Sequence, residues 1–268
     1  MTETPSKYSN AILAKHPNAQ NLRAPEIQGS QNNVLFADIN NKTFVFKFNT
    51  LEQIQKNIYV SNIYKTHHIP CPNIKFGEHN GIFFEEYESL PGIPFYKAIA
   101  NGMPECKIKQ VYDEILYHIK TMRQITIPQT LCFRNLHAHQ FAKEHTTNVN
   151  NALIGQICMA LVYSVNVGPK SDISLYHSDI TPKNTIVSPD GHLVGFIDID
   201  SVVISNINYI FGMMCANYIQ HGYDINELIT KYQKISGQKI NRHRVRTIAD
   251  TVAFGKKLLW QHAHKKNK

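Results

Sequence analysis

The chain has 268 residues, of which 43% are hydrophobic, and a formal net charge of +8 at pH 7, enough apolar residues for a substantial buried core. No apolar run approaches the length of a membrane span, and the start of the chain, Met1-Thr2-Glu3-Thr4-Pro5, is not typical of a signal peptide. Despite the positive charge we expect no nucleic-acid partner, because the sequence has no zinc-finger pattern, repeat or strand of interleaved aromatic and basic residues. The five cysteines are scattered without a Cys-x-x-Cys pair, so we expect free thiols and a cytoplasmic location.

The N-terminal part of the chain predicts a lead-in followed by two paired strands. Residues 1 to about 23 are polar, with a short helical piece at 11–14. Residues 33–38 and 42–48 alternate as strands do, and the Asn-Asn pair between them is typical of a hairpin turn. The alternation predicts that Lys47 points off one face of the sheet.

Further elements follow in chain order. Residues 51 to about 67 predict a helix, and 81–87 a strand that ends in the turn-forming stretch 88–92. Helical spacing of apolar residues predicts a helix at 107 to about 124, and a second, strongly apolar helix is predicted at 151 to about 165. After residue 200 we expect helices at about 206–220, 225–236 and 241–262.

The most specific polar pattern lies between residues 177 and 200. His177-Ser178-Asp179 is followed by Asn184 at the start of a predicted hairpin, whose second strand ends at Asp198. Because both ends of a hairpin lie on one side, Asn184 and Asp198 can share magnesium ions, which prefer oxygen ligands. Asp179 is placed to orient and deprotonate a hydroxyl. This is the arrangement that phosphoryl transfer from ATP requires; the alternative is a loop with solvated carboxylates.

At these residues the chain resembles the aminoglycoside phosphotransferase and choline kinase family of small-molecule kinases. The family pattern is His-Gly-Asp, four residues, Asn and then Ile-Asp, and this chain has Ser178 in place of the Gly. The resemblance implies an α+β, two-lobed protein-kinase-like fold. Its small antiparallel-sheet lobe with one helix would span residues 1–87, and its larger, mostly helical lobe 88–268.

The resemblance also implies roles for the polar residues of the pattern. Asp179 would be the catalytic base, Asn184 and Asp198 would bind the metal, and Asp200 lies where many relatives carry a further acid at the metal site. His177 would shape the catalytic loop rather than take part in the chemistry.

In the small lobe the resemblance implies a nucleotide site. Lys47 matches the lysine that pairs with the nucleotide phosphates, and Gly29 and Ser30 lie where relatives have the phosphate-covering turn. Backbone groups near Glu86 and Tyr87 would meet the adenine edge. The cofactors would be ATP or GTP with Mg²⁺, and the partner a small-molecule hydroxyl acceptor of aminoglycoside, choline or sugar type. The alternatives are a solvated surface lysine, an ordinary loop and an edge strand.

Two departures from the family pattern leave a second function open. Asn57 stands where relatives carry the Glu that holds the phosphate lysine, and the only acid of that helix is Glu52. Residues 206–211 contain no acid where relatives often have an Asp, and Asn208 is the candidate replacement. The alternative function is therefore a degenerate pseudokinase that acts as a nucleotide- or partner-binding module.

Overall fold

The structure, a computed structural model, describes residues 7–25, 33–127, 173–218 and 224–265. The chain forms two compact units. The first unit comprises Met1–Gly92 together with Val194–Asp200, and the second comprises Ile93–Leu193 together with Ser201–Lys268. The predicted lobes were continuous in sequence, whereas the first unit takes in a segment from far along the chain.

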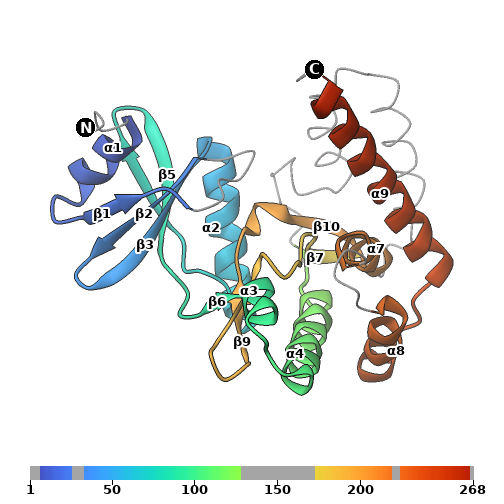
Figure 1. The fold of residues 1–268 in the computed structure, drawn as a ribbon. Helices are drawn as coiled ribbons and strands as arrows, with labels where there is room; N and C mark the ends of the chain where they lie inside the picture. Colours follow the sequence, from blue (N-terminus) through green and yellow to red (C-terminus); the bar gives the residue numbers. More distant parts are fainter. Residues whose placement is uncertain (1–6, 26–32, 128–172, 219–223, 266–268) are drawn as a thin grey trace. The chain divides into compact units, whose positions relative to one another are not determined.

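A five-stranded antiparallel sheet is the frame of the first unit (Figure 1). Its strand order is β1-β2-β3-β5-β4. Asn40 and Asn41 join β2 to β3 with φ values of 51° and 64°, which confirms the predicted Asn-Asn turn, because Asn tolerates this left-handed region. The strands are β1 (Gln20–Arg23), β2 (Asn33–Ile39), β3 (Lys42–Phe48), β4 (Lys75–His79) and β5 (Ile82–Glu88).

The two faces of this sheet have different chemistry. Because side chains alternate along a strand, Phe46, Phe48 and Phe84 lie on one face, where they form an aromatic core with Ala11 and Ile12 of α1 (Lys7–Lys15). The predicted lead-in thus contains a helix that belongs to the first unit.

The other face carries Lys47 and Glu85, which lie opposite each other in the ladder between β3 and β5. Helix α2 (Leu51–Thr66) contacts β5, and its Asn57 hydrogen-bonds Glu85. Helix α2 begins at Leu51, as predicted, because the Thr50 hydroxyl accepts a hydrogen bond from the Gln53 amide.

The segment Val194–Asp200 joins the first unit through backbone contact. It contains most of β9 (Leu193–Phe196), and the Phe196 amide donates to the Pro70 carbonyl at 3.0 Å. A Cβ on Gly195 would lie 3.0 Å from that same carbonyl oxygen and 2.9 Å from Leu90 Cδ1. Glycine is therefore required for this close approach.

The second unit is mostly helical. Strand β6 (Ile93–Pro94) pairs with β8 (Thr185–Val187), and β7 (Ile173–His177) pairs with β10 (Val202–Asn206), both antiparallel. The 3-10 helix η3 (Ile199–Ser201) precedes β10. The helices are α3 (Phe95–Ala100), α4 (Glu105–Arg123), α7 (Ile207–Tyr218), α8 (Ile225–Ser236) and α9 (Arg242–Lys265).

The core of the second unit confirms the periodicity expected for α4. Its predicted apolar face is fully buried, and α7, most of whose described side chains are buried, packs against α9. Gly212 of α7 lies so close to Ile248 that a Cβ would meet that side chain at 2.5 Å. The three C-terminal helices agree with the predicted ranges to within a few residues. The buried residues of α4 are the predicted Val111, Ile115, Leu116, Ile119 and Met122, together with Tyr112.

Some predictions lie outside the described residues. These are Gly29 and Ser30 and the helix at 151–165. Within the described ranges, no helix combines the length and apolar character needed to cross a membrane.

Candidate active site

Lys47 is the centre of a buried group of charges in the first unit. It is 5% exposed, and its Nζ lies 2.5 Å from Asp198 Oδ1 and 2.7 Å from Asp200 Oδ2. Lys47 and Asp198 are 151 positions apart in sequence. The fold therefore brings together three of the predicted site residues. With Glu85 and Asn57 they form what we call the Lys47 cluster.

The cluster keeps Lys47 in its charged form. Burial alone would lower the pKa of this ammonium group, but the carboxylates of Asp200, Asp198 and Glu85 outweigh burial and raise the pKa well above its ordinary 10.5. An ammonium group that stays charged is suited to bind phosphate oxygens.

Asp200 is held from several sides. Its carboxylate accepts hydrogen bonds from the Asn57 amide and, at 3.5 Å, from Asn49 Nδ2. Its main-chain carbonyl accepts from Nζ of Lys56, a lysine that is 1% exposed. Residues of the first unit thus fix the position of this carboxylate.

Asp198 is the more exposed carboxylate and adopts an unusual backbone conformation. Its side chain is 41% exposed, against 15% for Asp200. Its φ of 60° is in the left-handed region, which costs a non-glycine residue energy and is found most often at functional sites. Two converging carboxylates with oxygen donors are what a magnesium ion requires, so the residues fit the predicted metal role.

The sequence left open which carboxylate supports Lys47. Glu52 is exposed in the first turn of α2, whereas Asn57 is fully buried. The residue that we had not predicted is Glu85, which is 2% exposed and opposite Lys47 in the ladder. Burial and the nearby Asp200 raise the pKa of Glu85, while Lys47 and Asn57 act in the other direction. Alternation along 81–87 was the signal that could have identified it.

Glu86 and Tyr87 lie on β5, as predicted, but their side chains have different surroundings. The Glu86 carboxylate is on the α1 face, 2.7 Å from His16 Nε2 and 3.1 Å from Lys15 Nζ. It fastens α1 to the sheet. Burial raises the pKa of Tyr87. The role that we predict at the adenine edge belongs to the backbone of these two residues.

The predicted catalytic loop lies in the second unit, between β7 and β8. Asn184 Nδ2 donates to Asp179 Oδ2 at 2.7 Å and to the Asp179 carbonyl at 3.1 Å. The main-chain N–H of Asn184 in turn donates to the Thr181 carbonyl at 3.0 Å. The loop therefore brings together Asp179 and Asn184, and it directs the amide nitrogen of Asn184 toward the candidate base.

The residues before Asp179 hold this loop in place. The Ser178 hydroxyl donates to the Ser201 carbonyl at 2.6 Å, and the Ser178 amide donates to the same oxygen at 3.0 Å. The buried ring of His177 accepts the Asp179 amide at its Nδ1, 3.2 Å away. His177 thus shapes the loop through the backbone. The Ser that replaces the family Gly gains a bond that Gly could not make.

Asn208 has a different partner from the one that we predicted. Its Oδ1 accepts the Asn241 amide at 2.9 Å, directly before α9 begins, so it supports a helix start rather than the catalytic loop. The neighbouring Asn206 Oδ1 accepts the Tyr209 amide at 3.1 Å in the first turn of α7.

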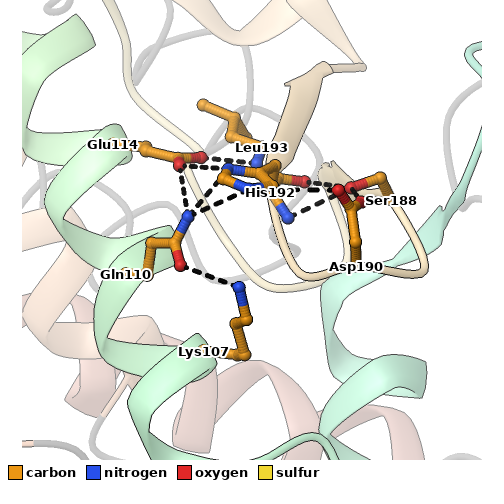
Figure 2. A network of polar contacts seen from close by, with 7 residues as sticks. All are labelled: Lys107, Gln110, Glu114, Ser188, Asp190, His192 and Leu193. Atoms are coloured by element: carbon orange, nitrogen blue, oxygen red, sulfur yellow. Dashed lines mark hydrogen bonds and ion pairs between the residues drawn. The ribbon is translucent and has the colours of Figure 1, made fainter.

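A second polar network joins α4 to the turn after β8, and Figure 2 shows it. At its centre, the Glu114 carboxylate accepts the Leu193 amide at 2.6 Å and contacts His192 Nδ1 at 2.9 Å and Gln110 Nε2 at 3.1 Å. Burial alone would raise the pKa of Glu114, but these hydrogen bonds outweigh it and lower the pKa. We call this group the Glu114 network; it comprises Lys107, Gln110, Glu114, Ser188, Asp190, His192 and Leu193.

Comparisons with known proteins agree with the fold and the site. The model of the phosphotransferase enzyme family matches residues 23–246. No curated protein was found to be a sequence relative of this chain.

Among solved structures, the chain is similar to the aminoglycoside phosphotransferase APH(3'')-Id from Streptomyces rimosus in complex with ADP and streptomycin. The TM-score is 0.68 at 12% identity, over 92% of this chain and 97% of that one. It is also similar to aminoglycoside phosphotransferase APH(4)-Ia, with a TM-score of 0.67 at 13% identity over 98% and 93% of the two chains. A third is APH(2")-IIIa with GDP and kanamycin, with a TM-score of 0.66 at 13% identity over 97% and 93%.

Since the family model spans most of the sequence and the solved structures share the protein-kinase-like fold that we predicted, this chain belongs to the phosphotransferase enzyme family.

Proposed function

We propose that this phosphotransferase moves the γ-phosphate of ATP or GTP to a hydroxyl group of a small molecule. The observation that carries the proposal is the Lys47 cluster. A charged lysine on β3 is held between Asp198 and Asp200, which come from the segment that follows the catalytic loop. In this role Lys47 binds the nucleotide phosphates, the contact that a buried ammonium makes best.

Asp179 supplies the base in this proposal. The acceptor oxygen forms a bond to the γ-phosphorus, the bond from that phosphorus to the bridging oxygen breaks, and the nucleoside diphosphate leaves with the electron pair. Asp179 takes the hydroxyl proton. The hydrogen bond of 2.7 Å from Asn184 orients the carboxylate for this step.

Asn184, Asp198 and Asp200 would hold magnesium. Their oxygen donors suit a hard cation that also uses phosphate oxygens, and the described residues contain no group of three or more His, Cys, Asp and Glu side chains that could hold a metal unaided. Bound magnesium would neutralise the charge on the phosphates. Asp200, fixed by Asn57, gives that site a rigid part.

The acceptor class is an amino-bearing or polyhydroxylated small molecule of aminoglycoside, choline or sugar type. Streptomycin and kanamycin accompany two of the similar structures, and these compounds make the first set of acceptors to test.

The experiment measures release of ADP or GDP from the purified protein with MgATP or MgGTP and a panel of acceptors. The panel contains streptomycin, kanamycin, hygromycin B, choline and simple sugars. We expect release that depends on one acceptor class and a product heavier by one phosphoryl group. Asp179→Ala should lower turnover by about 10²–10⁴-fold while nucleotide binding is kept. Unchanged turnover in that variant would refute the assigned base.

The pseudokinase alternative rests on Asn57 and on the absence of an acid in residues 206–211. The buried Glu85 beside Lys47 counts against it, because a module that only binds a partner has no need for three carboxylates around one lysine. Nucleotide binding without phosphorylation of any acceptor would favour the alternative.

A further inference from the structure

Glu85 is a buried carboxylate that the proposed reaction does not yet use. It is 2% exposed and lies directly opposite Lys47 in the antiparallel ladder of β3 and β5. The Cβ atoms of such opposite residues are about 4.5–5.5 Å apart on one face of the sheet. A carboxylate removed from water in this way needs a cation or hydrogen-bond donors. Lys47, opposite it on the neighbouring strand, supplies the cation.

Asn57 connects Glu85 to the rest of the Lys47 cluster. Its Nδ2 donates to Glu85 Oε2 at 2.8 Å and also to Asp200 Oδ1, while its Oδ1 accepts from Gln53 Nε2 at 2.9 Å. The amide group is thus directed at two carboxylates. An acid at position 57 would instead place a further negative charge against both of them. The amide on the helix and the acid on the strand form a matched pair.

We propose that Glu85 is a positioning residue that holds the Lys47 ammonium for the nucleotide phosphates, with Asn57 orienting its carboxylate; this inference rests on the proposed function. Asp198 and Asp200 contact Lys47 directly, but both are also assigned to the metal. Glu85 comes from the strand beside Lys47 and has no such second role. It supplies from the sheet the buried acid that α2 lacks, since Glu52, the only acid of that helix, is exposed.

An exchange of the two residues tests this assignment. The variants are Glu85→Gln, Asn57→Glu and the double variant, and the readout is ATP affinity by calorimetry in EDTA, where Lys47 acts without metal. We expect Glu85→Gln to weaken binding by about tenfold, which is within the range of coupling between neighbouring side chains. Asn57→Glu alone should also weaken binding, because it adds repulsion. The double variant returns one acid to the neighbourhood of Lys47 and should recover most of the affinity.

Glu88→Gln is the matched control. Glu88 lies on the same strand but is exposed and pairs with Lys42 at 2.8 Å, so its loss should leave ATP affinity unchanged. Circular dichroism and the melting temperature of each variant show that it is folded, and kcat and KM with magnesium separate positioning from a structural loss.

Two outcomes would overturn the assignment of Glu85. One is wild-type affinity in Glu85→Gln; the other is a double variant in which the two losses add instead of recovering. A wild-type protein that binds ATP but phosphorylates no acceptor would refute the proposed function, while these affinities would still decide the role of Glu85. A wild-type protein that binds neither ATP nor GTP would overturn both.

Discussion

The Lys47 cluster and the Glu114 network are both built around acidic side chains, but they differ in balance. In the cluster, the carboxylates of Glu85, Asp198 and Asp200 surround the Lys47 ammonium. In the network, the carboxylate of Glu114 meets a backbone amide, an imidazole and a side-chain amide, and that of Asp190 accepts from the Ser188 hydroxyl. The first arrangement has more acidic groups than Lys47 alone can pair with, whereas the second provides hydrogen-bond donors for both of its acids.

This difference distinguishes a ligand-binding site from a network that only supports the structure. Excess charge costs stability unless a ligand offsets it, so an unbalanced buried group indicates a place where a cation and phosphates are meant to bind. A balanced network such as that of Glu114 holds a turn in position and needs no ligand. Variants of the Lys47 cluster should therefore lose ligand binding but not stability, whereas variants of the Glu114 network should lose stability but not turnover.

The largest effect is expected for Asp198→Asn. We expect loss of the magnesium-dependent rise in melting temperature that a nucleotide produces, and a fall in turnover of at least about 100-fold, because the proposed magnesium site would lose a charged ligand. The ligand-free melting temperature should not fall, since the cluster loses surplus charge and Asn tolerates the left-handed φ of 60°. Thermal shift with and without MgATP measures both. A destabilised protein that still binds MgATP would reverse the comparison.

Gly195→Ala should affect both stability and the site. The added Cβ would meet the Pro70 carbonyl oxygen at 3.0 Å, and a backbone atom has little freedom to move. We expect a loss of about 1–3 kcal/mol, as for other overpacked positions, together with weaker MgATP binding because a shift of β9 displaces Asp198, two residues beyond its end. Chemical denaturation and calorimetry would show both. Alanine variants of Gly81, Gly102 and Gly237 are not suitable controls. Their φ values of 75°, 83° and 68° are in the left-handed region, where alanine adds strain of its own.

Glu114→Gln should lower stability without abolishing turnover. Loss of the charge weakens its hydrogen bonds from Leu193 and His192, at a cost of about 1 kcal/mol and a few degrees in melting temperature. Because folding lowers the pKa of Glu114, its contribution is present above its ordinary pKa of 4.5 and is lost as the pH falls through the lowered value. Melting curves from pH 7 down to pH 3 test this. Glu105→Gln is the comparison on the same helix: Lys109 also lowers the pKa of Glu105, but solvent screens this exposed pair, so the difference should be smaller.

The smallest effect is expected for Ser178→Ala. It removes the hydroxyl that donates to the Ser201 carbonyl at 2.6 Å, but the Ser178 amide still donates to that oxygen. We expect a loss of about 0.5–1.5 kcal/mol and a modest change in kcat. If turnover fell as far as in Asp179→Ala, Ser178 would belong to the chemistry and not to the support of the loop.

Local patterns in the sequence were sufficient for most of the elements. The Asn40-Asn41 turn, the Thr50 cap and the apolar spacing of α4 are each set by neighbouring residues, and the structure confirms them. Strands β1, β4, β6, β7 and β10 were not predicted. Val202–Asn206 is rich in β-branched residues, but its pairing with β7 depends on a partner distant in sequence, which a local pattern cannot supply.

The residues of the candidate site that belong to a sequence motif could be predicted, whereas the residue that reaches the site through strand pairing could not. Lys47, Asp198 and Asp200 followed from the resemblance, and the structure brings them together. Glu85 was missed because we looked for the supporting acid on the helix, in the place that relatives use. Only the ladder between β3 and β5 shows that it lies opposite Lys47.

The late segment of the first unit has a consequence for synthesis. Ribosomes make proteins from the N-terminus, and domains generally fold as they emerge. The sheet residues up to Gly92 are made long before Val194–Asp200, the segment that brings partners to Lys47 and Lys56. Until then the nascent small unit has two buried-site lysines without those acceptors, so a chain stopped just short of residue 194 should depend on chaperones for as long as it exists.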